Sequence, residues 1–199
     1  MADDVFIEKN DLYEIIDGEK IMASTPNLEH GTISCRLCCI IGDYLIKKNI
    51  GGVFRETAYV ELPDGNILRP DVFIICDLSL IDPFGKIKCV PDLCVEVLSR
   101  STMKPDRFKK KDIYERNGVK EYWIINPFDK SIEVYYLVDG KYELDEIYYW
   151  YSTAEWDELT DEEKAAAKFE IKVSLFDDLL VDVREVFRWW GEPLPVYNR

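Results

Sequence analysis

Two carboxylates stand in segments whose other residues are almost all apolar. Asp71 opens the segment DVFIIC, and Glu96 lies inside LCVEVL. Nearly continuous apolar runs of this length are typical of central strands that are covered on both faces. A charge buried there needs a cation, hydrogen bonds or a raised pKa, because burying it alone costs several kcal/mol. Two such carboxylates on neighbouring strands could bind Mg²⁺ or Mn²⁺, which would polarise a phosphoryl oxygen and activate water.

Each carboxylate also has a purely structural interpretation. A Pro-Asp pair commonly marks a turn or the first residue of a strand, and Asp92 shows the same pair without obvious chemistry. Glu96 could instead form a buried salt bridge with a basic residue that follows it. The sequence leaves these interpretations open beside the metal site.

A lysine is the third residue that could take part in this chemistry, and helical geometry chooses among Lys109, Lys110 and Lys111. At about 100° per residue, Lys110 shares a helix face with apolar partners, whereas its two neighbours point outward. That face carries Met103, Asp106, Ile113, Tyr114 and Asn117. A lysine drawn inward beside two carboxylates could stabilise developing phosphoryl charge or position the attacking water. The alternative is a lysine that extends toward solvent and pairs with Asp106 one turn earlier.

Local patterns indicate the elements that must position these residues. Asp17-Gly18 between the alternating runs LYEII and EKIMAS predicts a β-hairpin with a type I′ turn. A helix is predicted after Pro26 to about Lys48, ended by the glycines of Asn49-Ile50-Gly51-Gly52. The other patterns predict strands at 53–62, 67–76, 89–99, 122–127, 131–138 and 141–151, a helix at about 105–117 closed by Gly118, a helix or insertion at 152–169, and a final strand and helix.

The order of these elements predicts the fold class. After the N-terminal hairpin come a helix, several strands, a second helix and further strands, a pattern typical of a mixed central sheet flanked by helices in the α/β (α+β) class. We expect one domain over residues 1–199, with its core at about 12–180, because this length suits a single hydrophobic core.

Charge and composition limit the classes of function. The chain carries 39 acidic and 25 basic residues and a net charge of −14, which counts against a protein that holds DNA by its phosphates. A local excess of basic residues from Arg100 to Lys120 leaves a positive face possible, although a solvated helix surface explains it equally well. The N-terminus is no signal peptide, and no apolar run could cross a bilayer. We therefore expect a soluble, cytoplasmic protein without a membrane partner.

The six cysteines are expected to pack in the core. They lie in or beside apolar helical and strand-like runs, where a free cysteine behaves as a small hydrophobe. A structural zinc site needs four ligands in paired spacing, but the chain has one CxxC and one histidine.

Several segments, in order, resemble the Uma2 family of restriction-endonuclease type. They are YEIIDGEKIMAS, RPDVFIIC, PDLCVEVLSRST, DRFKKKDIYERNGVKEYWIINP and SLFDDLLVD, and the match runs from about Leu12 to Leu180. The resemblance implies a restriction-endonuclease-like core of the PD-(D/E)xK superfamily, a divalent metal (Mg²⁺ or Mn²⁺), and hydrolysis of DNA phosphodiester bonds. It also implies a possible homodimer, since two sites cut two strands most simply.

Carried over by position, the family pattern places its two acidic metal ligands on Asp71 and Glu96. The wider superfamily has a lysine two positions after the second acid, but Leu98 stands there. The family pattern places the lysine on the following helix instead, where Asp106, Lys110 and Tyr114 match its spacing. Glu14 and His30 also match recurring family positions, with an exposed hairpin residue and a helix-entry residue as their structural alternatives. Residues 152–168 match no recognised part of the family.

Two functions of different class follow from the sequence. The first is a Mg²⁺-dependent endonuclease whose catalytic residues are Asp71, Glu96, Lys110, Glu14 and His30. The second is a nuclease-like fold without activity, acting as a nucleic-acid-binding or assembly module, which the acidic net charge and Leu98 favour. The enzyme requires the Asp71 and Glu96 carboxylates within reach of one metal ion, at about 2.1 Å from each oxygen for Mg²⁺. If Glu96 instead pairs with an arginine and no open cavity exists, the catalytic interpretation fails.

Overall fold

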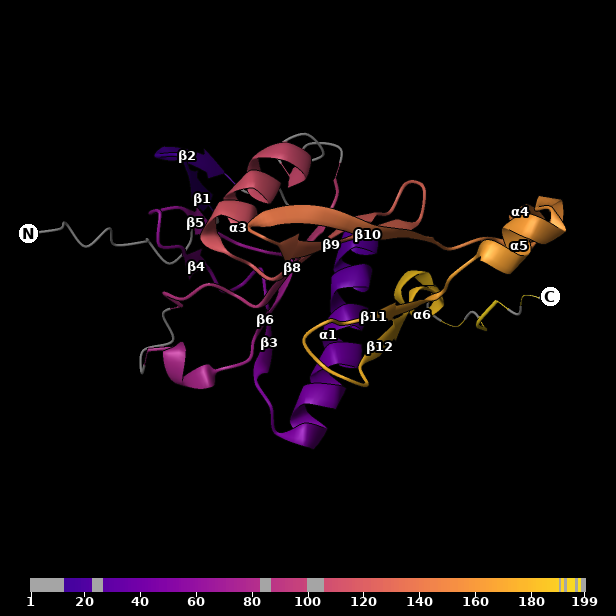
Figure 1. Ribbon diagram of the computed structural model, residues 1–199, viewed down its shortest axis with the longest axis horizontal. Helices are drawn as coiled ribbons and strands as arrows, with labels where there is room; N and C mark the ends of the chain where they lie inside the picture. Colours follow the sequence, from indigo (N-terminus) through magenta and orange to yellow (C-terminus); the bar gives the residue numbers. More distant parts are fainter. Residues whose placement is uncertain are drawn as a thin grey trace, which may run out of the picture.

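The computed structural model describes residues 13–22, 27–82, 87–99, 106–189, 191, 193–195 and 197. A mixed six-stranded sheet forms its centre, and a four-stranded sheet and a two-stranded sheet lie at either side of it (Figure 1). The central sheet runs in the order β10 (Lys141–Tyr149), β9 (Ser131–Val138), β8 (Glu121–Asn126), β7 (Leu93–Val97), β6 (Val72–Ile75) and β3 (Gly52–Arg55). Of its neighbouring pairs, β7 and β8 are parallel and the others are antiparallel.

The smaller sheets and the helices complete the described structure. The four-stranded sheet has the order β2 (Glu19–Met22), β1 (Tyr13–Ile16), β5 (Ile67–Leu68) and β4 (Val60–Glu61), and β11 (Glu170–Lys172) pairs with β12 (Leu180–Asp182). The helical elements are α1 (Leu28–Lys48), η1 (Leu78–Leu80), η2 (Asp106–Lys110), α3 (Lys111–Asn117), α4 (Thr153–Glu158), α5 (Asp161–Ala166) and α6 (Val183–Phe187). The predicted mixed sheet flanked by helices, with its N-terminal hairpin, is confirmed.

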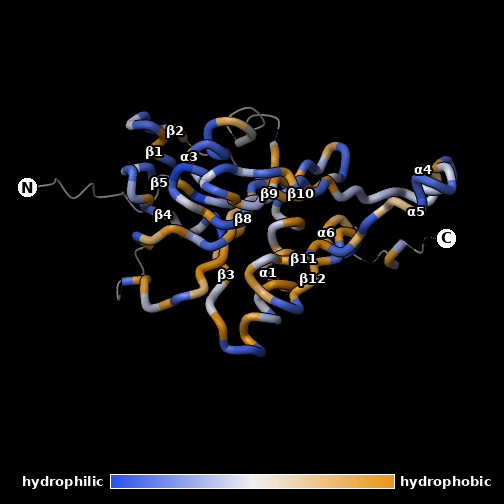
Figure 2. Tube along the Cα trace, in the orientation of Figure 1, coloured by the Kyte–Doolittle hydropathy of each residue, from blue (hydrophilic) through white to orange (hydrophobic). Residues whose placement is uncertain are grey.

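Two hydrophobic cores cover the two faces of the central sheet. Ile33, Leu37 and Ile41 of α1 pack with alternate residues of β6, β7 and β8 on one face. Ile113 and Tyr114 of α3, with residues of the four-stranded sheet, pack on the other face. Side chains of a strand alternate between faces, so Glu96 shares the α3 face with its neighbours Cys94 and Leu98. Figure 2 shows the hydrophobic segments gathered in these central elements, whereas α4 is mainly hydrophilic.

The two strands predicted at 53–62 and 67–76 are each broken in the structure. The first divides into β3 and β4 at a turn closed by the hydrogen bond from the Ala58 amide to the Arg55 carbonyl. The second divides into β5 and β6 around Arg69, Pro70 and Asp71, because proline lacks the amide that would continue the ladder. The halves join different sheets, and this division brings the β1 hairpin beside the central sheet.

The predicted hairpin and the predicted boundaries of α1 agree with the structure. Asp17 and Gly18 have φ of 50° and 83°, as a type I′ turn requires. Asn27 accepts a hydrogen bond from the His30 amide and begins α1. The helix ends at Lys48, as predicted, and the residue beyond it that adopts the left-handed conformation is Asn49, with φ of 54°, rather than one of the glycines that follow. Asparagine tolerates this conformation better than most residues.

The predicted helix at 105–117 begins with a π-helical turn. Residues 106–110 form η2, and the regular α3 follows to Asn117 and ends at Gly118, whose φ is 84°. Single π-turns occur often at functional sites. The segment at 152–169, left open between helix and insertion, forms α4 and α5, and each begins with a capping box. These two helices project at one end of the molecule (Figure 1).

The cysteines depart from the predicted core packing. Cys94 alone is buried, Cys35, Cys38 and Cys89 are partly buried, and Cys39 and Cys76 are exposed. All six are free thiols. Among the described helices, none has the length and apolar character needed to span a membrane.

Glu121, the first residue of β8, is fully buried and makes stability depend on pH. Its carboxylate accepts hydrogen bonds from Trp123 Nε1 and from the amide and hydroxyl of Ser174. Burial outweighs these bonds and raises the pKa of Glu121 from 4.5 to about 7. The native state therefore binds more protons than the unfolded state between these pH values, and the free energy of unfolding should fall by about 3 kcal/mol as pH rises through the window.

Urea unfolding of the wild type and of Glu121→Gln, from pH 4.5 to 8, tests this expectation. The variant lacks the titrating group, so its free energy of unfolding should not show this fall. The difference between the variant and the wild type should therefore change by about 3 kcal/mol in favour of the variant as pH rises. The exposed control Glu143→Gln should follow the wild type at every pH. If Glu121→Gln also runs parallel to the wild type, the raised pKa of Glu121 is wrong.

Candidate active site

Glu96 lies at the centre of a buried polar cluster on the α3 face of the sheet. Only 1% of the residue is exposed. Lys110 Nζ donates a hydrogen bond to Glu96 Oε2 at 3.1 Å, and the Tyr114 hydroxyl donates to Glu96 Oε1 at 2.7 Å. Lys110 and Tyr114 are one helical turn apart and therefore reach the same carboxylate. The charge of Glu96 is thus balanced inside the fold, as a carboxylate in an apolar strand requires.

Lys110 joins Glu96 to a second carboxylate from the N-terminal hairpin. Its Nζ lies 3.0 Å from Glu14 Oε1, which also accepts a hydrogen bond from the Arg69 amide at 2.8 Å. Glu14 and Lys110 are 8% and 6% exposed, so the interpretation of Glu14 as an exposed hairpin residue was wrong. The inward orientation predicted for Lys110 is found. The alternative partner of Lys110, the Asp106 side chain, lies outside the part that the structure describes. Met103 of the predicted helix face lies outside it as well.

Asp71 and His30 form a second pair beside this cluster. His30 Nε2 lies 3.1 Å from Asp71 Oδ2, which also accepts a hydrogen bond from the Val97 amide at 2.7 Å. His30 is buried in the first turn of α1, so it is more than a helix-entry residue. The bond to Val97 ties Asp71 to β7 at the residue next to Glu96. All five predicted site residues therefore lie at one end of β6 and β7.

The charges of this cluster suit a divalent cation. Glu14 and Glu96 share the ammonium of Lys110, and Asp71 pairs with the imidazole of His30 beside them, so the carboxylates outnumber the basic groups in a largely buried place. Among the described residues, no group of three or more histidine, cysteine or carboxylate side chains is arranged to hold a metal ion. A metal here would thus have two protein ligands, Asp71 and Glu96, with water completing its shell. Mg²⁺ is typically bound by one or two carboxylates and keeps several waters, so the donor set fits it.

Leu98 occupies the position where the wider superfamily has its lysine. Leu98 is 1% exposed and packs in the core with Ile113 and Tyr114 of α3. A lysine there would place its charge among apolar side chains. The ammonium reaches Glu96 from Lys110 of the helix instead. Tyr114 was placed on this helix face by the sequence, but its bond to Glu96 was not foreseen, because periodicity gives a direction and no partner.

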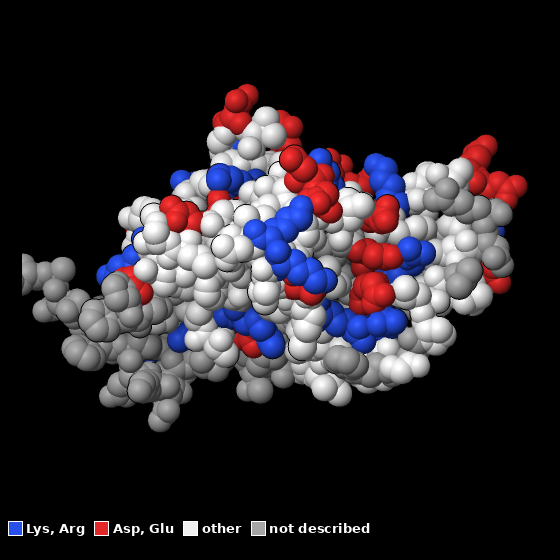
Figure 3. All heavy atoms as spheres, turned by 90° about the horizontal axis from the view of Figure 1, so that it is seen from below, with Lys and Arg blue, Asp and Glu red and all other residues white. Residues whose placement is uncertain are grey.

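Several exposed lysines of the described structure pair with neighbouring acids. Figure 3 shows Lys and Arg lying next to Asp and Glu over one face. Exposed lysines with a carboxylate oxygen within 3.0 Å are Lys47, Lys48, Lys88, Lys120, Lys141 and Lys168. Lys109 is exposed and forms no ion pair with a described residue. Lys111, predicted to point outward, is partly buried, with its Nζ 3.7 Å above the Tyr135 ring centre. Arg100 and Lys104, part of the predicted basic stretch, lie outside the described residues.

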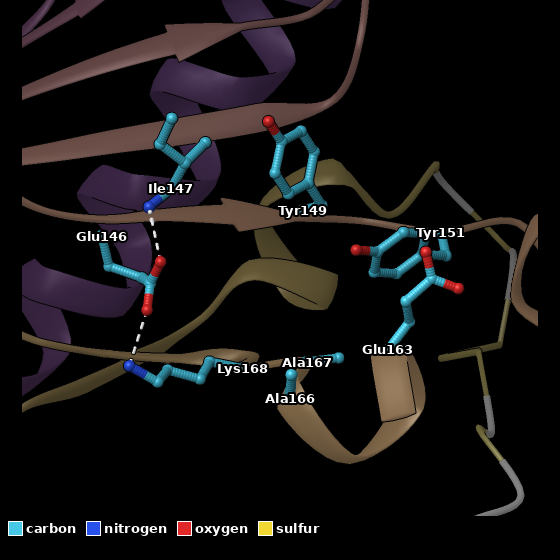
Figure 4. A pocket seen from close by; sticks show the side chains of 8 residues that line it. All are labelled: Glu146, Ile147, Tyr149, Tyr151, Glu163, Ala166, Ala167 and Lys168. Atoms are coloured by element: carbon cyan, nitrogen blue, oxygen red, sulfur yellow. Dashed lines mark hydrogen bonds and ion pairs between the residues drawn. The ribbon is translucent and has the colours of Figure 1, made fainter. Parts of the chain in front are cut away.

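A cavity of about 220 Å³ lies away from the five predicted residues, between the end of β10 and α5 (Figure 4). It is lined by Glu146, Ile147, Tyr149, Tyr151, Glu163, Ala166, Ala167 and Lys168. Lys168 is paired with Glu146 at 2.6 Å, and Glu163 accepts hydrogen bonds from Thr160. None of the five predicted site residues lines this cavity, so we do not take it as the candidate active site.

The family described as "Uma2: Putative restriction endonuclease" matches residues 5–174 of the chain. This protein belongs to the Uma2 family. Among solved structures, it is similar to "a putative nuclease belonging to DUF820 from Anabaena variabilis", with a TM-score of 0.67 and 19% sequence identity, over 88% of this chain and 89% of the other. At this identity the likeness shows a shared fold. No curated protein matches this Uma2 chain in sequence.

Membership of the Uma2 family confirms the resemblance seen in the sequence and places the chain in a family of nuclease type. The shared fold extends over most of both chains.

Proposed function

We propose that this Uma2 protein is an endonuclease that hydrolyses DNA phosphodiester bonds with Mg²⁺ or Mn²⁺. The observation that supports this most is the convergence of Glu14, His30, Asp71, Glu96 and Lys110, from separate elements, at one end of β6 and β7. Asp71 and Glu96 would hold the metal. When bound, the metal would polarise a phosphoryl oxygen and lower the pKa of a bound water.

The other residues of the cluster have distinct tasks in this proposal. Lys110 places a buried ammonium beside Glu96, where it would stabilise the negative charge that develops on the phosphoryl oxygens. Glu14 also contacts Lys110, with its Oε1 3.0 Å from the lysine Nζ. His30 and the Val97 amide orient Asp71 through its Oδ2, which leaves Oδ1 without a hydrogen bond from the described residues and available to a metal.

The alternative function is an inactive nuclease-like fold that binds nucleic acid or a partner protein. The pair between Lys110 and Glu96 is consistent with it, because the ammonium already balances that carboxylate. The net charge of −14 and the paired surface lysines also favour it. A purely structural ion pair between Lys110 and Glu96 does not account for the second pair, of His30 and Asp71, beside it. For this reason we favour the enzyme over the inactive fold.

Cleavage of supercoiled plasmid decides between the two functions. Wild type, Asp71→Ala and Glu96→Ala are compared with Mg²⁺, Mn²⁺ or EDTA. The proposal expects nicking by the wild type that requires the metal and is lost in both variants. Equal nicking by all three proteins would identify a contaminating nuclease and refute the proposal. Light scattering tests the homodimer that cutting both strands would favour.

Lys109 is the exposed cation best placed to contact a phosphate near this site. We expect Lys109→Ala to weaken DNA binding at every sequence tested and to reduce the salt dependence of log K by about 1, the effect of one lost phosphate contact. Fluorescence anisotropy at several salt concentrations measures this, with Glu96→Gln in the background to prevent cleavage. Lys141→Ala, whose lysine is paired with Glu115 at 2.7 Å, should leave the slope unchanged. Equal slopes of log K against log salt concentration for the two variants would show that Lys109 does not contact a DNA phosphate.

A further inference from the structure

The two oxygens of Glu96 are held by different side chains of one helix face. Oε2 accepts from Lys110, and Oε1 accepts from the Tyr114 hydroxyl at 2.7 Å. Tyr114 is 1% exposed and lies against Tyr122, with ring centres 5.2 Å apart. Packing therefore fixes the ring independently of its hydrogen bond to Glu96. A donor that is already immobile orients its acceptor with little further loss of conformational entropy.

We propose that Tyr114 is a positioning residue for metal binding, an inference that rests on the proposed function. The tyrosine holds Oε1 and thereby fixes the orientation of the whole Glu96 carboxylate, including Oε2, which accepts from Lys110. Without the hydroxyl, the carboxylate can rotate about its terminal torsion, which is broad for glutamate. Partners that orient a metal ligand in this way typically change metal affinity by about 10–100-fold when they are removed.

A purely structural role for the Tyr114 hydroxyl makes a different prediction. In that case the loss of the hydroxyl would lower stability but leave metal affinity unchanged. Tyr142 provides a matched control, because its ring stacks on the same Tyr122 at 5.7 Å, and its hydroxyl donates to the Val119 carbonyl at 2.9 Å. Tyr142→Phe thus removes one hydroxyl from the same aromatic cluster without touching Glu96.

The test measures Mn²⁺ affinity by titration calorimetry in the wild type, Tyr114→Phe and Tyr142→Phe, without DNA. Both variants keep the aromatic ring, and circular dichroism confirms that each is folded. We expect about 10–100-fold weaker Mn²⁺ binding in Tyr114→Phe and wild-type binding in Tyr142→Phe. Nicking by Tyr114→Phe should recover in part at high Mn²⁺.

The outcomes separate this inference from the proposed function. Wild-type affinity in Tyr114→Phe, or an equal loss in both variants, overturns the positioning role of Tyr114 alone. Failure of the wild type to bind Mn²⁺ overturns the proposed function, and this inference with it.

Discussion

Glu96→Gln should lower the rate of plasmid nicking at saturating Mg²⁺ by about 10³-fold or more. The substitution keeps the size of the side chain and an oxygen for the Tyr114 hydroxyl, but it removes the charge that would attract the metal. A bound metal contributes several kcal/mol to the stabilisation of the transition state, and each 1.4 kcal/mol is a factor of ten in rate. Asp71→Asn should have an effect of similar size, since both carboxylates are proposed ligands.

The matched control for this substitution is Glu121→Gln on the neighbouring strand. Glu121 is fully buried and pairs in register with Leu93 of β7, but its hydrogen bonds go to Trp123 and Ser174. Its side chain therefore lies on the face of the sheet opposite Glu96. Glu121→Gln should change stability and leave nicking within about twofold of the wild type. Similar losses of activity in Glu121→Gln and Glu96→Gln would mean that the buried carboxylates act through folding, and the metal proposal would fail.

Lys110→Met should both destabilise the fold and slow nicking. Methionine fills a similar volume but leaves Glu14 and Glu96 buried without their shared cation. Removal of one partner of a buried ion pair typically costs about 3–5 kcal/mol of the free energy of unfolding. Loss of one preorganised donor to the transition state typically lowers kcat by about 10²–10³-fold. Urea unfolding and plasmid nicking measure the two effects separately.

Magnesium should recover part of the stability lost in Lys110→Met. A ligand that binds only the native state raises the free energy of unfolding, and the carboxylates freed from the lysine would attract the metal more strongly. Lys111→Met is the control, because Lys111 lies next in the chain and its ammonium contacts the Tyr135 ring rather than a carboxylate. Lys110→Met with wild-type stability would show that the ammonium does not balance Glu14 and Glu96.

The sequence by itself determined the local elements and the direction of several site residues. Asp17-Gly18 fixes the hairpin, because only residues that tolerate positive φ form this turn. Apolar residues on both sides of Glu96 place it inside a covered strand, since few other elements explain such a run. A rotation of about 100° per residue selects Lys110 from three consecutive lysines and directs it inward. Each of these conclusions depends on neighbours in the chain.

The tertiary structure alone decided which of these residues meet. Nothing local to Glu14 indicates that it is buried. Its contact with Lys110 exists because the predicted strand is interrupted at Pro70, so that β5 joins the smaller sheet and pairs with β1. His30 meets Asp71 because α1 packs across the central sheet. Tyr114 meets Glu96 because α3 lies on the opposite face. Periodicity gives the face on which a side chain lies, whereas its partner depends on how helices and sheets distant in sequence pack together.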